Sequence, residues 1–138
     1  MKINLRCKIS RIKASYPLIL NPRFNLGHVA LGVGDSSLAY QCFRLSLVHN
    51  NENPEAYNNL GILEMAHNRF DLAKAFFQAS QNLGPMMFEP NFNNGYLAYQ
   101  TGDLQTSFQA LNKSLELFPN HASTKELLKE VQEQFSVL

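Results

Sequence analysis

The sequence predicts an all-α protein built from three helical hairpins and one closing helix. Three observations lead to this prediction. The chain repeats itself with a period of thirty-four residues, and the repeated positions alternate small and bulky side chains as two packed helices require. The last stretch has an apolar face at helical spacing. At 138 residues, the chain is long enough for one domain with a modest core rather than for two.

The repeat consists of six positions that carry the same type of residue in all three copies. The copies start at Leu20, Pro54 and Phe88, with predicted boundaries of about 20–53, 54–87 and 88–121. The six columns are Gly27/Gly61/Gly95, Gly34/Asn68/Gly102, Ala39/Ala73/Ser107, Phe43/Phe77/Leu111, Ser46/Ser80/Ser114 and Asn51/Pro85/Pro119. They are the eighth, fifteenth, twentieth, twenty-fourth, twenty-seventh and thirty-second positions of the repeat. Agreement at six positions over three copies indicates a structural repeat.

Each column has a physical role in a pair of antiparallel helices. Small residues at the eighth and twentieth positions let the two backbones approach, and the bulky residue at the twenty-fourth position belongs to the core. Gly or Asn at the fifteenth position suits a left-handed cap after the first helix, and Asp35 and Asp103 follow as N-caps of the second helix. Asn53 and Pro54 begin the second hairpin in the same way. The predicted helices are 24–33, 36–49, 55–67, 70–83, 90–101, 104–117 and the closing helix 122–136.

The start of the chain differs from the rest in composition. Residues 1–34 hold six basic side chains and no acid, whereas the remainder carries six basic and eleven acidic side chains, a net charge of −5. This charge gives no reason to expect nucleic-acid binding by the acidic part. Residues 1–22 fit both strand and helix spacing, and their composition also resembles a mitochondrial transit peptide. We therefore separate a basic lead segment, 1–22, from a repeat domain, 23–138.

The sequence contains no motif of a catalytic or metal-binding site. It lacks HExxH, CxxC and a P-loop, and no two histidines are spaced to place two ligands on one helical face. Cys7 and Cys42 form no disulfide framework and suit a reducing compartment. No apolar run approaches the roughly 18–20 residues that span a bilayer. We therefore predict no enzyme activity, no catalytic residue, no metal and no cofactor.

The thirty-four-residue unit resembles the tetratricopeptide repeat over about residues 20–119. The resemblance implies a right-handed superhelix in which the first helix of each hairpin lines a concave surface. Stretches 27–65, 88–108 and 117–138 are similar to the C-terminal repeats of the tetratricopeptide-repeat subunits of the BBSome. That similarity implies a non-catalytic scaffold in a coat-like complex that carries membrane proteins to and from cilia. The implied location is the cytoplasm, cilium, basal body and centrosome, with only indirect membrane contact.

Two departures from that family lie at the start of the chain. Residues 1–22 do not resemble it, and Arg23 stands where an aromatic residue is expected. The first hairpin also lacks a preceding neighbour against which to bury its face. The chain therefore reads like the end of a longer protein, and a divergent paralogue, an alternative start and a fragment all stay open.

The predicted binding surface is the concave face that the resemblance implies. Its candidate residues are Asn25, His28, Asn58, Asn59, Ile62, Met65, Phe92, Asn93, Tyr96 and Tyr99. No Lys or Arg stands at the inward positions, so the basic clamp with which chaperone-binding repeats hold a carboxylate is missing. The aromatic residues among the candidates could anchor a partner helix or pack against a neighbouring subunit.

Asn25, Asn59 and Asn93 recur at the sixth position of each copy. A ladder of carboxamides could bracket an extended peptide backbone, or each Asn could hydrogen-bond a neighbouring helix, and the sequence leaves both interpretations open. The expected partners are other protein subunits of a BBSome-like complex, and extended peptides. The alternative function is a free-standing peptide-binding adaptor or co-chaperone without a carboxylate clamp.

Overall fold

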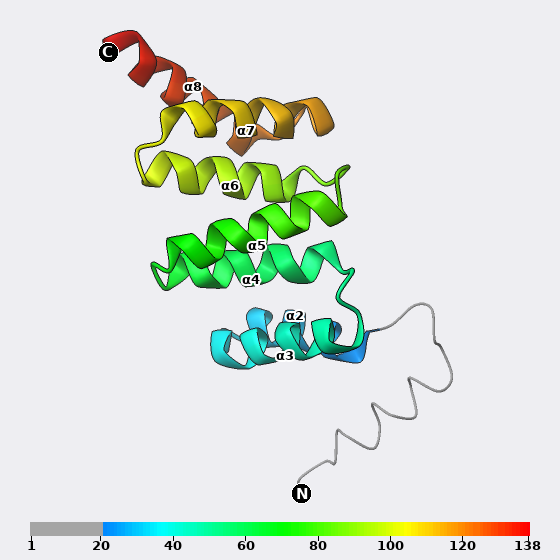
Figure 1. Cartoon of the computed structure of the whole chain (residues 1–138). Helices are drawn as coiled ribbons and strands as arrows, with labels where there is room; N and C mark the ends of the chain where they lie inside the picture. Colours follow the sequence, from blue (N-terminus) through cyan, green and yellow to red (C-terminus); the bar gives the residue numbers. More distant parts are fainter. Residues whose placement is uncertain (1–20) are drawn as a thin grey trace, which may run out of the picture. The chain divides into compact units, whose positions relative to one another are not determined.

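A computed structural model describes residues 21–138 (Figure 1). The predictions for residues 1–20 of the lead segment lie outside this part of the chain. All regular secondary structure in the described part is helical. The helices are α2 (Pro22–Gly32), α3 (Ser36–His49), α4 (Pro54–Ala66), α5 (Phe70–Leu83), α6 (Glu89–Gln100), α7 (Leu104–Leu117) and α8 (Ala122–Val137). The chain divides into two units, Met1–Glu52 and Asn53–Leu138.

The helices pair as the repeat predicts. Helix α2 packs on α3 in the first unit, and α4 packs on α5 and α6 on α7 in the second. Helix α8 closes the second unit by packing on α7. Every helix boundary lies within two residues of the predicted one. The prediction of an all-α helical repeat is therefore confirmed.

The turn inside each hairpin uses the left-handed backbone that the fifteenth column predicts. Gly34 and Gly102 both have φ 81°, and Asn68 has φ 59°. An L side chain rarely adopts this conformation, and Gly and Asn adopt it at least cost. The repeated Gly or Asn therefore ends the first helix and redirects the chain into the second.

Two of the second helices begin with an aspartate cap. The Asp35 carboxylate accepts a hydrogen bond from the Leu38 amide at 2.9 Å, and the Asp103 carboxylate accepts one from the Thr106 amide at 3.0 Å. Hydrogen bonds to the Thr106 side chain and backbone hold the pKa of Asp103 below its usual range. Each carboxylate satisfies an amide that has no partner within the helix, so it stabilises the helix start.

The eighth and twenty-fourth columns explain how closely the paired helices approach. A β-carbon on the glycine would meet the facing side chain at 2.6 Å for Gly27 and Phe43, 2.5 Å for Gly61 and Phe77, and 2.9 Å for Gly95 and Leu111. All three facing side chains are fully buried. The large side chain of the second helix therefore fills the space that the glycine of the first helix leaves open.

Two serines of the twenty-seventh column close the second and third hairpins by hydrogen bonds. The Ser80 hydroxyl donates to the Pro54 carbonyl at 2.7 Å, and the Ser114 hydroxyl donates to the Phe88 carbonyl at 3.1 Å. Both serines are fully buried. Each bond joins the end of the second helix to the first residue of the same copy, so these two serines hold the paired helices together. The Ser46 hydroxyl of the first copy instead donates to the Phe43 carbonyl of its own helix at 2.7 Å.

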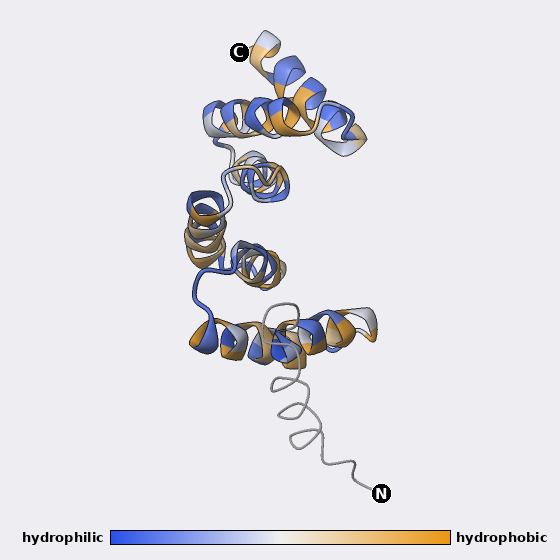
Figure 2. Cartoon of the chain, turned by 90° about the vertical axis from the view of Figure 1, so that its right-hand side faces the viewer, coloured by the Kyte–Doolittle hydropathy of each residue, from blue (hydrophilic) through white to orange (hydrophobic). Residues whose placement is uncertain are grey.

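The core of the second unit consists of two clusters. Ala73, Phe77 and Leu97 form one, where α5 meets α6. The other joins Leu111 of α7 to three residues of α8, namely Leu127, Leu128 and Val131. Figure 2 shows polar and apolar residues alternating along α8, so one side of this helix supplies the contact and the other stays polar.

Candidate protein-binding face

Helices α4 and α6, the first helices of the second and third hairpins, lie in contact within the second unit. The two helices carry eight of the ten predicted binding residues, of which Ile62 and Tyr96 are exposed, and an exposed acid at each helix start. We call this surface the α4–α6 face. It consists of Glu55, Asn58, Asn59, Ile62 and Met65 on α4 and Glu89, Phe92, Asn93, Tyr96 and Tyr99 on α6.

A direct hydrogen bond joins the two helices on this face. The Asn93 carboxamide donates to the Asn58 carboxamide oxygen at 2.9 Å, and Asn58 is buried. Asn93 thus bonds a neighbouring helix, which was one of the two interpretations of the Asn column. Asn59 lies half-buried beside this pair. The peptide-binding ladder itself stays a prediction.

An apolar strip of the face is open to solvent. The rings of Phe92 and Tyr96 stack with centroids 6.5 Å apart and planes at 20°. Tyr96 is 37% exposed and Ile62 on α4 is 38% exposed. Met65 differs, because it is half-buried and packs on the core between α5 and α6. The available apolar contacts are therefore Ile62, Tyr96 and the partly buried Phe92.

Tyr99 is occupied by α8. The Gln134 side chain donates to the Tyr99 hydroxyl at 3.1 Å, and the Tyr99 ring packs on the α7–α8 core cluster. Desolvation raises the pKa of Tyr99, and a hydrogen bond with Glu130 raises it further. These partners could not be predicted from the repeat, because α8 lies outside the thirty-four-residue unit. Tyr99 therefore marks where α8 borders the α4–α6 face.

The face is acidic. Glu55 and Glu89 are exposed in the first turns of α4 and α6, and neither helix contains a Lys or Arg. The unit as a whole has five basic and nine acidic side chains, a net charge of −4. A bound anion would therefore meet no basic side chain from α4 or α6.

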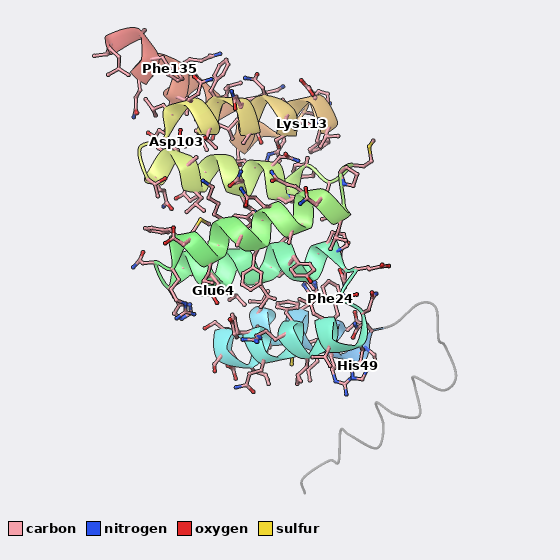
Figure 3. All side chains as sticks on the ribbon, viewed as in Figure 1. Phe24, His49, Glu64, Asp103, Lys113 and Phe135 are labelled. Atoms are coloured by element: carbon pink, nitrogen blue, oxygen red, sulfur yellow. The ribbon has the colours of Figure 1, made fainter. Side chains whose placement is uncertain are left out.

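An ion pair between a buried carboxylate and a half-exposed guanidinium lies at the end of α4. Glu64, which is labelled in Figure 3, is fully buried. Its carboxylate pairs with the Arg69 guanidinium, which is half exposed. Arg69 occupies the N-cap position of α5 and forms no side-chain cap. The other two copies have Ala and Asp at these two positions. The second copy replaces Ala by Glu64 and Asp by Arg69, and this simultaneous change to opposite charges was the signal in the sequence for an ion pair.

The two remaining candidates, Asn25 and His28, belong to α2 of the first unit. Asn25 is exposed. The His28 ring lies 4.7 Å from the Phe24 ring and 5.4 Å from the Phe43 ring, both at edge-to-face angles. His28 is thus in part an aromatic packing residue of its own hairpin.

In residues 21–138 no group of three or more His, Cys, Asp or Glu side chains is placed to hold a metal ion. No described helix is long and apolar enough to cross a membrane. Cys42 is buried, and this burial, followed by the charge of Asp35, raises the pKa of its thiol. A raised thiol pKa disfavours the reactive thiolate.

One cleft of about 170 Å³ lies where α5, α6 and α7 meet. Its lining residues are Phe70, Asp71, Lys74, Asn94, Leu97, Ala98, Thr101, Asp103 and Thr106. Small-molecule sites usually exceed about 300 Å³ and are mainly apolar, whereas this cleft is smaller and mixed in polarity. We therefore do not assign it a ligand.

Comparison with known proteins places this geometry in context. No family model matches the sequence. Mouse tetratricopeptide repeat protein 8 is 48% identical over 115 residues, which is 83% of this chain and 22% of that relative. The chain thus spans less than a quarter of the length of this relative.

Two solved structures share the fold at 16% sequence identity. The first tetratricopeptide-repeat domain of Spaghetti (RPAP3), bound to the HSP90 peptide SRMEEVD, has a TM-score of 0.78 and covers 83% of this chain and 93% of its own. MamA has a TM-score of 0.79 over 93% of this chain and 75% of its own. The chain therefore has the tetratricopeptide-repeat fold and is similar in sequence to tetratricopeptide repeat protein 8.

Proposed function

We propose that the chain is a non-catalytic scaffold for protein–protein interaction that acts as a BBSome-like subunit in ciliary membrane-protein trafficking. The similarity to tetratricopeptide repeat protein 8 carries this proposal, because 48% identity over 115 residues extends well beyond the repeat columns that the fold alone would preserve. The partners are other protein subunits of the complex. Contact with the membrane is indirect, through the complex.

The surface chemistry supports a binding role. The α4–α6 face combines exposed apolar side chains, such as Ile62 and Tyr96, with carboxamides and acids. Apolar anchors surrounded by polar groups are the usual composition of a protein interface. Such a face needs no metal or cofactor to bind a partner.

Co-purification tests this function. The full chain, tagged at its C-terminus, is expressed in ciliated cells and recovered under mild conditions, and the bound proteins are identified by mass spectrometry. We expect BBSome subunits to be recovered with it, and the first tetratricopeptide-repeat domain of Spaghetti is the control for the fold alone. A monodisperse monomer that recovers no such subunit from the same extract would contradict the proposal.

The second candidate function is a free-standing peptide-binding adaptor or co-chaperone. The fold of the Spaghetti domain bound to SRMEEVD favours it. Without a basic clamp, such an adaptor has to bind the peptide through its backbone and not through its terminal carboxylate. Peptides with a free and with an amidated C-terminus should therefore bind with equal affinity. Asn59→Ala with Asn93→Ala then lowers the affinity by about 1 kcal/mol per lost hydrogen bond. Unchanged affinity in the double variant would exclude this candidate.

A further inference from the structure

We propose that the α4–α6 face binds an extended segment of a partner protein that presents an arginine between apolar residues. This inference rests on the proposed function as a protein-binding scaffold and names the chemistry of the bound segment. Three features carry it: the charge of the face, the stacked rings on α6, and the position of one carboxylate relative to those rings.

The charge of the face selects a cation. The exposed charged groups of α4 and α6 are Glu55 and Glu89, since Glu64 is buried and paired with Arg69. Opposite charges attract over roughly 10 Å at ordinary ionic strength, so these two acids attract a basic segment and repel an acidic one.

The stacked rings of Phe92 and Tyr96 supply the contact for an arginine side chain. Their planes are nearly parallel, at 20°, and Tyr96 is 37% exposed, so a planar guanidinium can lie against an aromatic surface. Lysine lacks this planar shape and gains less from such a surface. The rings therefore favour arginine among the cations.

Glu89 lies within reach of the same guanidinium. It precedes Phe92 by three residues and Tyr96 by seven on one helix, so all three share a face over about two turns, or roughly 10 Å. A carboxylate accepts two parallel hydrogen bonds from a guanidinium, which fixes its orientation. Ile62 on the neighbouring helix is 38% exposed and offers an apolar contact for a flanking residue.

Binding is measured by fluorescence anisotropy with the full chain and two labelled peptides. Both are acetylated, amidated decapeptides with three charged residues between leucines, and the charges are arginines in one and glutamates in its twin. We expect the arginine peptide to bind at least tenfold more tightly than the glutamate twin. Its affinity should fall several-fold between 50 and 500 mM NaCl, because the attraction is partly electrostatic. Equal affinity for the two peptides would overturn the proposal.

Substitutions then locate the bound arginine. We expect Glu89→Gln to weaken the arginine peptide about tenfold and Tyr96→Leu about fivefold. Glu116→Gln removes the same charge from an exposed position on α7 and should leave the affinity unchanged. Circular dichroism melting curves confirm that each variant is folded at the assay temperature. If Glu116→Gln weakens peptide binding as much as Glu89→Gln does, the attraction is non-specific and the assignment of this face is overturned.

Two outcomes separate this inference from the proposed function. If BBSome subunits co-purify but the arginine peptide does not bind, the inference fails and the function stands. If the peptide binds through Glu89 and Tyr96 but no subunit co-purifies, the function fails and the inference stands. The chain could instead form a concentration-dependent dimer through this face. If such a dimer forms, and the arginine peptide neither binds nor dissociates it, the occupant is a second copy of the chain and the inference is overturned.

Discussion

The ring of Phe77 occupies the space beside Gly61 that a side chain on residue 61 would need. A β-carbon there would lie 2.5 Å from a ring carbon of Phe77, and both residues are buried. Real β-carbons do not approach another carbon so closely, so either the ring or the backbone would have to move. This contact sets the distance between α4 and α5.

The first prediction follows from this contact. Gly61→Ala should lower the free energy of unfolding by about 1–3 kcal/mol, the usual cost of overpacking a core, although alanine favours the helix itself. Urea denaturation followed by circular dichroism measures the change.

Gly32 is the matched control. It also lies in a helix, but a β-carbon there would have no atom of the described part of the chain within 4 Å. Gly32→Ala should therefore leave the stability unchanged or raise it slightly. Equal effects of the two substitutions would mean that the Phe77 contact does not decide the cost at Gly61.

The second prediction concerns the serine that closes the second hairpin. Ser80→Ala removes the hydrogen bond to the Pro54 carbonyl and leaves that acceptor partly buried. We expect a loss of about 1–2 kcal/mol in the free energy of unfolding.

Ser107 provides the comparison for Ser80. It is fully buried as well, but its hydroxyl has no hydrogen-bond partner among residues 21–138, and the other two copies have alanine at this position. Ser107→Ala should be neutral or stabilising by up to about 1 kcal/mol, because a buried hydroxyl without a partner is unfavourable. Destabilisation by Ser107→Ala equal to that of Ser80→Ala would argue against the role of the Ser80 bond.

The third prediction concerns the buried ion pair. Arg69→Ala should lower the free energy of unfolding by about 2 kcal/mol, because it removes the partner of the buried Glu64 carboxylate. The double variant Glu64→Ala with Arg69→Asp introduces the residue types of the other two copies and a potential N-cap.

Denaturation of both variants tests this argument. We expect the double variant to be at least about 1 kcal/mol more stable than Arg69→Ala alone, because it also removes the buried charge. A double variant that is no more stable than Arg69→Ala would contradict it.

The fourth prediction is a pH dependence that comes from Asp103. The folded-state pKa of its carboxyl is lowered by hydrogen bonds to Thr106, so its contribution to stability is present above the unfolded pKa of about 4 and is lost as the pH falls through the folded pKa. In Asp103→Asn, the melting temperature should fall less than in the wild type between pH 5 and pH 2.5, because Asn caps without titrating.

Alanine separates the cap from the charge at this position. Asp103→Ala removes the cap at every pH and should cost about 1 kcal/mol at pH 7, whereas Asp103→Asn should cost little there. If Asp103→Asn loses as much stability in acid as the wild type, the Asp103 carboxylate is not the titrating group.

The helices could be predicted closely because local chemistry sets their ends. Pro54 and Asn53 start α4, Gly102 ends α6 in a left-handed turn, and Asp103 starts α7. Each of these signals works within a few residues of the chain. The pairing of the helices could then be predicted from the repeat, because the same small and bulky positions recur in every copy.

The candidate face was less predictable, because its contacts depend on side chains from other helices. The Asn93–Asn58 bond joins residues thirty-five positions apart in the sequence. Gln134, which donates to the Tyr99 hydroxyl, lies on α8, a helix that is not part of the repeat. A column of identical residues indicates a shared place on the fold, but not the neighbour that each copy meets there. That is why Asn93 could be placed on the face, and a bond to a neighbouring helix considered, while Asn58 could not be foreseen as its partner.

The Asn93–Asn58 bond has a consequence for recognition. The Asn93 amide and the Asn58 oxygen already satisfy each other, so a peptide backbone that takes over this donor and acceptor exchanges one hydrogen bond for another, and only the second Asn93 N–H and the remaining lone pairs can add a new bond. Backbone contacts at this point therefore contribute little discrimination between ligands. Selectivity between ligands therefore comes from side-chain contacts. The Asn93–Asn58 pair contributes about the same binding free energy for every segment that lies over it.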